Sequence, residues 1–579
     1  AGHPADAAAE SGKPGSQEFG GCRIGRRISN LWINDLLSGD ENFDAVEVEL
    51  RPGFADHYDS LDGSITAGHN WEGGNAYISY SRAQNDALNG EDLGWFKMYP
   101  QNRPDLGLTE PILATTCNPG NVSVGGKIYA LPYGPTSFGT TNVPAAGSPN
   151  DCDLTTNFDL YPEVDRDSLM VGLNQELSDK VNLEVRGYYM QRDVTANSGP
   201  TKFTANVAAA TIPAFGIVSS PSYFSHMTTP FNFTEFHQVS VQLGPDNVQE
   251  INLETFGIYP TLTIDLPNSW QARVQGSYGE SETENISPSA NGTAVNTAQS
   301  VGLFNPYDLS ASNPEAIAAI SNFGTYGRAD QSLLDMSVIV DGDLFSLPGG
   351  EVKLAAGVEY QDQQFDGKNG EVVIGTHDTG FGGYLISDAS RGLVNFPLIP
   401  ARSPLPTSSL SRDVQSLFTE LVVPVVGEGN ALPGIEELTL SLSGRYDDYS
   451  DFGDTTNPKI GFNWRPVNWI AVRGAKGDSF VAPSLANDES TTLSSASIVS
   501  GLGFLYPPQA FIDAGLFPAV TPGQSVIVVQ GNAPDIKPQK AETTSIGFDI
   551  EPPAIENLTL SATWWNIEFE GLIDIPGFV

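Results

Sequence analysis

The chain has 579 residues, of which 70 are acidic and 28 are basic, and its formal net charge is −42. So large an acidic excess excludes a nucleic-acid-binding protein, because contacts to phosphates depend on Lys and Arg. Aromatic residues reach 10% and charged residues only 17%, which excludes a disordered chain, and no run of 18 apolar residues is present to form a transmembrane helix.

From residue 46 onward the sequence consists mainly of runs in which polar and apolar residues alternate, and a period of two predicts β-strands. We count about fifteen such runs of about 9–14 residues each, longer than the usual strand of a globular protein. They lie near 46–56, 61–69, 75–83, 166–176, 181–192, 253–265, 269–280, 331–342, 352–364, 412–425, 438–446, 456–465, 468–477, 541–551 and 557–569. Helical periodicity is confined to 314–321 and 511–515.

The connections between these runs alternate between short turns and long segments rich in Gly, Pro, Asn and Ser. The long segments lie near 84–164, 194–250, 282–328, 366–410 and 478–540. Membrane barrels have this rhythm, with short periplasmic turns and long outer loops, and a sheet in lipid must close because unpaired backbone groups are costly there. The pattern predicts an all-β, antiparallel transmembrane β-barrel with long extracellular loops. A β-sandwich whose apolar face lies in a core is the alternative.

The polar positions of the predicted strands form the candidate functional surface, because they face the lumen of a membrane barrel. Seven residues in three runs are the clearest candidates. They are Asn182, Glu184, Arg186, Gln271, Arg273, Gln275 and Arg445. Ligand contacts are expected mostly from the long loops, which a rigid frame holds in place.

The three cysteines are Cys22, Cys117 and Cys152, and none belongs to a CxxC pair, so a cysteine zinc site is not expected. Cys117 and Cys152 flank a loop-like segment rich in Gly, Pro and Asn, and they are the candidate disulfide in an oxidising compartment. Cys22 is left without an assigned role.

Catalytic and metal-binding motifs do not stand out in the sequence. None of the six histidines has the HExxH spacing, and the GDSFVAP turn at 477–483 is not a GxSxG nucleophile motif. The acidic run formed by Asp447, Asp448, Asp451 and Asp454 lacks the EF-hand order, so we interpret it as a solvated loop tip, with calcium bridging to lipopolysaccharide as the alternative. We therefore expect no enzyme activity, no cofactor and no resident metal.

Several blocks of the sequence carry a resemblance to a known family. They are AVRGAKGDSFVAPSL at 471–485, RYDDYSDFGDTTNPKIGFNW at 445–464, the Ile-Lys-Pro block at 532–549 and the CNPGN stretch at Cys117. Together they resemble the barrel of the TonB-dependent outer-membrane receptors of Gram-negative bacteria, in a proteobacterial subgroup whose loop is often bracketed by two cysteines. The resemblance covers about residues 46–579, although Gln539 stands where the family usually has Glu.

The resemblance implies a barrel of about 22 strands around an N-terminal plug. Residues 1–45 are too short for that plug, so we expect 1–45 to be an unassigned remnant outside the barrel. We expect 46–579 to be a barrel truncated at its C-terminus, with about fifteen of the strands present.

The implied function is TonB-dependent uptake of a scarce nutrient of the ferric siderophore, cobalamin or oligosaccharide class at the outer membrane. The implied partners are the TonB complex of the inner membrane, acting through the plug, the lipid and lipopolysaccharide of the outer membrane, and the small nutrient ligand. Two alternatives stay open: a plugless porin-like passive channel, and a secreted β-rich binding or adhesion protein.

Overall fold

The computed structural model describes most of the chain from residue 43 onward. The described residues are 43–93, 116–124, 127–131, 149–150, 158–208, 236–374, 383–399, 405, 407–485, 495–499, 526–530, 537–555 and 558–573. No helix among them is both long and apolar enough to cross a bilayer.

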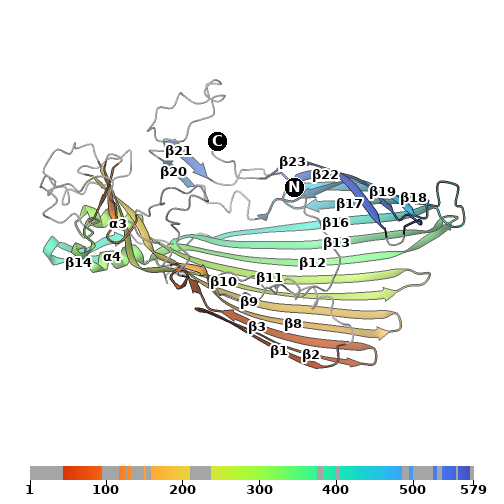
Figure 1. Cartoon of the computed structure of the whole chain (residues 1–579), viewed down its shortest axis with the longest axis horizontal. Helices are drawn as coiled ribbons and strands as arrows, with labels where there is room; N and C mark the ends of the chain where they lie inside the picture. The colour runs from red at the N-terminus through yellow and green to blue at the C-terminus, as the bar shows by residue number, and fades with distance from the viewer. Residues whose placement is uncertain are drawn as a thin grey trace, which may run out of the picture.

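Fifteen long strands form one antiparallel sheet, in which each strand pairs with the next long strand along the chain (Figure 1). Their bounds are β1 (Val46–Ala55), β2 (Tyr58–Trp71), β3 (Gly74–Asn85), β8 (Glu163–Ser178), β9 (Val181–Ala208), β10 (Phe236–Asp265), β11 (Gln271–Ser289), β12 (Phe323–Leu347), β13 (Gly350–Val372), β16 (Thr407–Val426), β17 (Glu437–Tyr449), β18 (Gly453–Val467), β19 (Ile470–Val481), β22 (Gln539–Ile550) and β23 (Leu560–Glu570). Each of the fifteen predicted runs corresponds to one of these strands, which confirms the large antiparallel sheet.

The outer strands of this sheet are β1 and β23. Among the described residues, β1 pairs only with β2, and β23 pairs only with β22. Because all neighbours are antiparallel and the strands number fifteen, β1 and β23 run in the same direction. A direct pairing between them would therefore be parallel, unlike every other pairing of long strands in the sheet.

The predicted strand length of about 9–14 residues is wrong for the middle of the sheet. β9 has 28 residues, β10 has 30 and β12 has 25, so these strands continue far into segments that the sequence indicates as loops. The reason lies in the composition of the extensions. Residues 194–202 lack a regular alternation of polar and apolar residues, so this part of β9 has the composition of a loop.

Short turns join the strands at one end of the sheet, as predicted, and the long connections lie at the other end (Figure 1). In the turn between β10 and β11, Asn268 and Ser269 both adopt positive φ, at 62° and 61°. Two consecutive residues with positive φ form the kind of tight turn whose twist matches that of the flanking strands. This geometry explains how five residues can reverse the chain between two long strands.

Smaller elements gather at the end with the long connections. They are β4 (Leu88–Asn89), β5 (Asn121–Val124), β6 (Lys127–Ala130), β7 (Asp159–Tyr161), α3 (Gly292–Ser300), α4 (Pro314–Ser321), β14 (Tyr384–Asp388), β15 (Leu393–Ile399), β20 (Ser495–Val499) and β21 (Val526–Gln530). α4 confirms the helix predicted at 314–321, with Asn313 as its N-cap and Pro314 in its first turn. α3 was missed because its Gly, Thr and Asn residues are weak helix formers, and 511–515 lies outside the described residues.

These elements enclose a core at the loop end, which we call the loop-end core. It joins α3 and α4 to the β14–β15 hairpin and to the extended parts of β9 and β10. Its most buried members include Val207, Val239, Ala298, Leu303, Phe304, Ile320, Leu398 and Ile399, each fully shielded from solvent. The described parts of these connections therefore pack into an ordered structure with its own hydrophobic core.

Candidate functional site: the two faces of the sheet

The strand register places all seven predicted polar candidates on one face of the sheet, which we call the polar face. Residues opposite each other in an antiparallel pair lie on the same face. One row of opposite residues crosses eight strands. It consists of Glu184, Thr261, Gln275, Ser337, Glu359, Ser416, Asp447 and Thr455. Every position in this row is polar.

The other five candidates occupy neighbouring rows of the same face. Asn182 and Arg273 lie opposite Thr263, and Arg445 continues their row on β17. Gln271 lies one row closer to the short turns, and Arg186 lies one row closer to the loop end. The seven residues therefore share a face without forming a single cluster, because they extend over four rows on the three strands β9, β11 and β17.

The densest contacts on the polar face surround Arg445. Its Nε donates to Asp447 Oδ1 at 2.7 Å, its Nη1 donates to Glu359 Oε2 at 2.9 Å, and its Nη2 donates to Ser416 Oγ at 2.8 Å. The guanidinium also lies over the ring of Phe418, 5.9 Å from its centroid. One basic side chain thus bridges β13, β16 and β17, with charge-assisted hydrogen bonds to two carboxylates.

Sequence reasoning missed the partners of Arg445. Glu359 and Ser416 lie on the two long strands that precede β17, and the sequence does not specify the register in which these strands pair. Asp447 was interpreted as part of a solvated loop tip, and that is wrong, because its side chain is 1% exposed on β17. Its spacing of two residues from Arg445 was the available signal, since it places both on one face of a strand.

The acidic run does not form a calcium cage. Asp447 faces Arg445, Asp448 lies on the opposite face of β17, and Asp451 in the following turn accepts from Arg412 Nη2 at 2.6 Å. Across the described parts of the chain, no group of three or more His, Cys, Asp or Glu residues could hold a metal ion.

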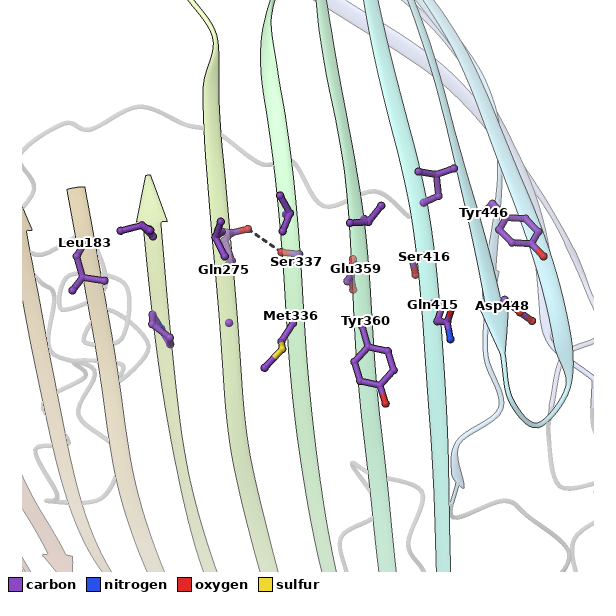
Figure 2. Close-up of a pocket in the computed structure, with 17 residues that line it drawn as sticks. Leu183, Gln275, Met336, Ser337, Glu359, Tyr360, Gln415, Ser416, Tyr446 and Asp448 are labelled. Carbon is purple, nitrogen blue, oxygen red and sulfur yellow. Dashed lines mark hydrogen bonds between the residues drawn. The ribbon is translucent and has the colours of Figure 1, made fainter. Parts of the chain in front are cut away.

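The opposite face of the sheet, the apolar face, carries the other positions of the same strands. One of its rows consists of Leu183, Leu262, Val274, Val338, Val358, Leu417 and Tyr446. This row and the adjacent one line a shallow trough of about 890 Å³. In Figure 2 the side chains of Met336 and Tyr360 project from the near side of their strands, whereas those of Glu359 and Ser416 lie behind the ribbon.

Solvent exposure differs sharply between the two faces. On the apolar face, Met336 is 55% exposed and Leu417 is 57% exposed. On the polar face, Ser337 is 9% exposed and Ser416 is 6% exposed, although each is the chain neighbour of one of those apolar residues. In these central rows the polar side chains are buried against one another while the apolar ones are exposed, which is the reverse of a water-soluble sheet.

Aromatic residues mark both borders of the apolar face. Trp71 and Trp464 are exposed near the short turns. Toward the loop end, Tyr80 donates to Asp167 Oδ1 at 2.5 Å, and Tyr360 donates to Asp413 Oδ1, also at 2.5 Å. Rings with one polar tip suit the boundary between hydrocarbon and water, so these residues outline an apolar band with polar edges.

Beyond the tyrosines the same face becomes charged. Arg328 Nη2 lies 3.0 Å from Glu282 Oε2, and Arg328 Nε lies 2.9 Å from Asp330 Oδ2. Partial burial raises the pKa of Glu282, although the nearby guanidinium acts in the opposite direction. Charged side chains on the face that is apolar elsewhere in the sheet indicate that this part of β11 and β12 lies in water.

Cys117 is disulfide-bonded, and its candidate partner Cys152 lies outside the described residues, as does Cys22. The segment around Cys117 docks on the extension of β10 through the pairing of β5 with 238–240. Asn150 holds the segment in place, since its backbone N–H donates to Asn121 Oδ1 at 2.7 Å and its Nδ2 donates to Gly120 O at 3.0 Å. A long connection is thereby fixed to the sheet.

The fold and its two contrasting faces define a protein of the membrane-barrel class. The family model of the TonB-dependent receptor-like β-barrel matches residues 246–577. The chain belongs to this family, which consists of receptors and transporters and not of enzymes. The recognition made from the sequence blocks is confirmed.

The solved structures that this chain resembles are receptors and importers, of which it covers about half. The G324V mutant of the ferric enterobactin receptor PfeA from Pseudomonas aeruginosa matches with a TM-score of 0.45 and 14% identity, over 90% of this chain and 52% of PfeA. The siderophore receptor PirA from Acinetobacter baumannii matches with a TM-score of 0.45 and 10% identity, over 92% of this chain and 53% of PirA. The RagAB peptide importer in its closed-closed state matches with a TM-score of 0.43 and 9% identity, over 88% of this chain and 44% of the importer chain.

The chain therefore spans about half the length of these proteins. A comparison with curated proteins found no match.

Proposed function

We propose that this chain is the barrel portion of an outer-membrane receptor that captures a scarce nutrient at the cell surface and delivers it to the periplasm. The observation that carries the proposal is the contrast between the exposed apolar face and the packed polar face. Exposing an apolar band to water costs about 25 cal/mol per Å². Contact with lipid acyl chains removes that cost, and it leaves the polar face to surround the lumen.

In this arrangement Asn182, Glu184, Arg186, Gln271, Arg273, Gln275 and Arg445 line the lumen. The loop-end core then lies outside the cell and holds the connections that meet the ligand. The proposed ligand is a ferric siderophore, cobalamin or an oligosaccharide. The proposed partners are lipopolysaccharide and the TonB complex, which acts through a plug within the lumen.

The direction of the strands sets a condition on closure of the barrel. Because β1 and β23 run in the same direction, a closed antiparallel barrel built on this sheet requires an odd number of additional strands between them.

The proposed domain division keeps 46–579 as barrel and 1–45 outside it. The proposed disulfide joins Cys117 to Cys152, and peptide mapping without reduction tests it.

Fractionation of Gram-negative cells that export the chain tests the membrane assignment. We expect the chain in the outer-membrane fraction, released by detergent and not by alkaline carbonate. Release into buffer without detergent would contradict the proposal and favour the secreted binding protein.

Planar bilayers separate the receptor from the porin-like channel. For a receptor, protein that carries a plug conducts little until the plug is removed. Steady, large conductance with the plug in place would favour a passive channel.

A further inference from the structure

Two arginines stand directly opposite each other on the polar face. They are Arg166 on β8 and Arg192 on β9, which are neighbouring strands of the sheet (Figure 1). Arg192 follows Arg186 on β9 by an even number of positions, so both project from the polar face. The side chains of Arg166 and Arg192 are exposed.

This pair differs from the other arginines of the sheet in having no carboxylate partner. Within the described structure, no salt bridge and no hydrogen bond involves the guanidinium of Arg166 or Arg192. All nine other arginines whose side chains the structure describes lie within 3.5 Å of a carboxylate. In a chain with 70 acidic and 28 basic residues, two adjacent arginines without such a partner are an exception.

The nearest carboxylates in sequence belong to the other face. Asp165 and Asp167 flank Arg166 on β8, and alternation along a strand turns them to the apolar-face side. There both bind Arg82, with its Nη2 3.1 Å from Asp165 Oδ1 and its Nη1 3.1 Å from Asp167 Oδ2. Neither aspartate is therefore available to Arg166 or Arg192.

The polar face around the pair adds no negative charge. The adjacent polar-face positions on β3, β8, β9 and β10 are all uncharged, and they are Ala83, Val164, Ser168, Met190, Val194 and Leu253. Ser168 contributes a hydroxyl group on the side of the short turns. The two guanidinium groups are thus the only charges in this part of the described polar face.

A structural role does not explain the pair. Like charges directly opposite each other in an antiparallel sheet are destabilising. The position suits a ligand instead, because Arg166 lies opposite Ala83, which follows the border residue Tyr80 toward the loop end. A solute that enters the proposed lumen from outside would meet both guanidinium groups.

We propose that Arg166 and Arg192 together bind one oxyanion of a solute, a carboxylate or phosphate group. Each guanidinium is planar and donates two parallel hydrogen bonds to such a group, so two of them enclose it from both sides. The proposal deepens the proposed function and rests on it only in taking the polar face as the wall of the lumen. It favours a negatively charged ligand over a neutral saccharide.

The direct test uses the whole chain, folded in detergent micelles, with sodium phosphate and sodium citrate as probes. Ionic strength is held constant with sodium chloride, whose anion accepts no bidentate pair of hydrogen bonds. We expect saturable binding, measured from the broadening of the NMR signals of the probes. Arg192→Gln should weaken it about tenfold, since one of two charged contacts is lost. Failure of both probes to bind would overturn the proposal.

The matched control is Arg465→Gln. It removes the same charge from the polar face, but Arg465 is paired with Glu437 at 3.5 Å near the short turns. Binding should be unchanged in this variant. Equal weakening by both substitutions would contradict the proposal, because the effect would then follow net charge and not the arginine pair.

Urea unfolding without any probe tests the absence of a partner within the chain. In low salt, Arg192→Gln should raise the unfolding midpoint by relieving the repulsion, and about 1 M sodium chloride should remove the difference. Arg465→Gln, which loses an ion pair, should show no such rise. A lower midpoint for Arg192→Gln would mean that contacts within the chain use this side chain, and the proposal would be wrong.

These measurements are made in micelles, so they do not depend on where the protein resides in the cell. The fractionation experiment tests residence separately. Binding by a chain that is not retained in the outer membrane would preserve the anion site and remove the transport role, whereas retention without binding would do the opposite.

Discussion

The loop-end core and the apolar face of the sheet use similar side chains in opposite ways. Phe304 and Leu398 in the loop-end core are fully buried, whereas Met336 and Val358 on the apolar face are more than half exposed. Both regions belong to one continuous set of strands, since β9 and β10 pass from one into the other. Strand formation alone therefore does not decide where apolar side chains are buried.

The surroundings of each region explain the difference. At the loop end, strands and helices lie in water and must cover their own apolar atoms, so they form a conventional core. In the proposed arrangement, lipid covers the apolar face at the height of the band, and the polar groups have to satisfy one another on the other side. The predictions below test this contrast from the largest expected effect to the smallest.

The largest effect is expected from Phe304→Ala in the loop-end core. Truncating a fully buried aromatic side chain leaves a cavity and costs about 3–5 kcal/mol. The loss should be local, so that hydrogen exchange accelerates in α3, α4 and the extension of β10 while β13 stays protected at its centre. Phe345→Ala is the control, since Phe345 is 58% exposed; comparable exchange changes in both variants would contradict the loop-end core.

Val358→Arg should destabilise the sheet through the apolar face. A charge at mid-depth on the lipid face of a barrel costs about 2–4 kcal/mol. Gln361→Arg adds the same side chain to the same strand on the polar face, opposite Asp335, and should cost far less. Denaturant unfolding from lipid vesicles compares the two, and a larger loss for Gln361→Arg would mean that the faces are assigned the wrong way round.

The strands were predictable because the two faces of the sheet carry different residue types at alternate positions. Val274 and Gln275 are neighbours in sequence, and their polarity alone indicates that they face opposite sides. That signal is interrupted in segments such as 194–202, so the extensions of the middle strands could not be distinguished from loops. α3 was equally hidden, because packing and the Asn291 cap stabilise it more than its residue propensities do.

The sequence predicted which candidate residues share the polar face, but not which residues they contact there. Arg445 was identified from its alternating run, but Glu359 and Ser416 became its partners through strand pairing that no local pattern encodes. Asp447 could have been found, because the period of two in β17 continues through it. The neighbouring acidic residues concealed that continuation by giving the segment the composition of a turn.

Arg445→Met should be destabilising by about 1–3 kcal/mol, a range reduced because the side chain is partly exposed. The substitution leaves Glu359 and Asp447 without their shared cation. Adding Asp447→Asn to this variant should recover part of the loss, because it removes one of the unpaired charges. A double-mutant cycle measured by denaturant unfolding gives the coupling, and strictly additive effects would mean that the pair does not act together.

The smallest effect concerns glycines that lie beneath aromatic rings of the neighbouring strand. Gly172 on β8 lies opposite Tyr77 on β3, and a Cβ added at Gly172 would lie 2.2 Å from a carbon of the tyrosine ring. A ring over a glycine shields its exposed backbone and helps to fix the register of the two strands. Gly172→Ala must displace that ring, at a cost of about 1–2 kcal/mol.

Gly444→Ala is the matched control for this prediction, because Gly444 also lies within a strand but no atom lies within 4 Å of its added Cβ. That substitution should be neutral or slightly stabilising, since alanine loses less backbone freedom on folding. The difference between the two variants in denaturant midpoint measures the contribution of the ring. Equal midpoints would show that Tyr77 moves aside freely, and that polar-face packing, unlike that of the loop-end core, tolerates added volume.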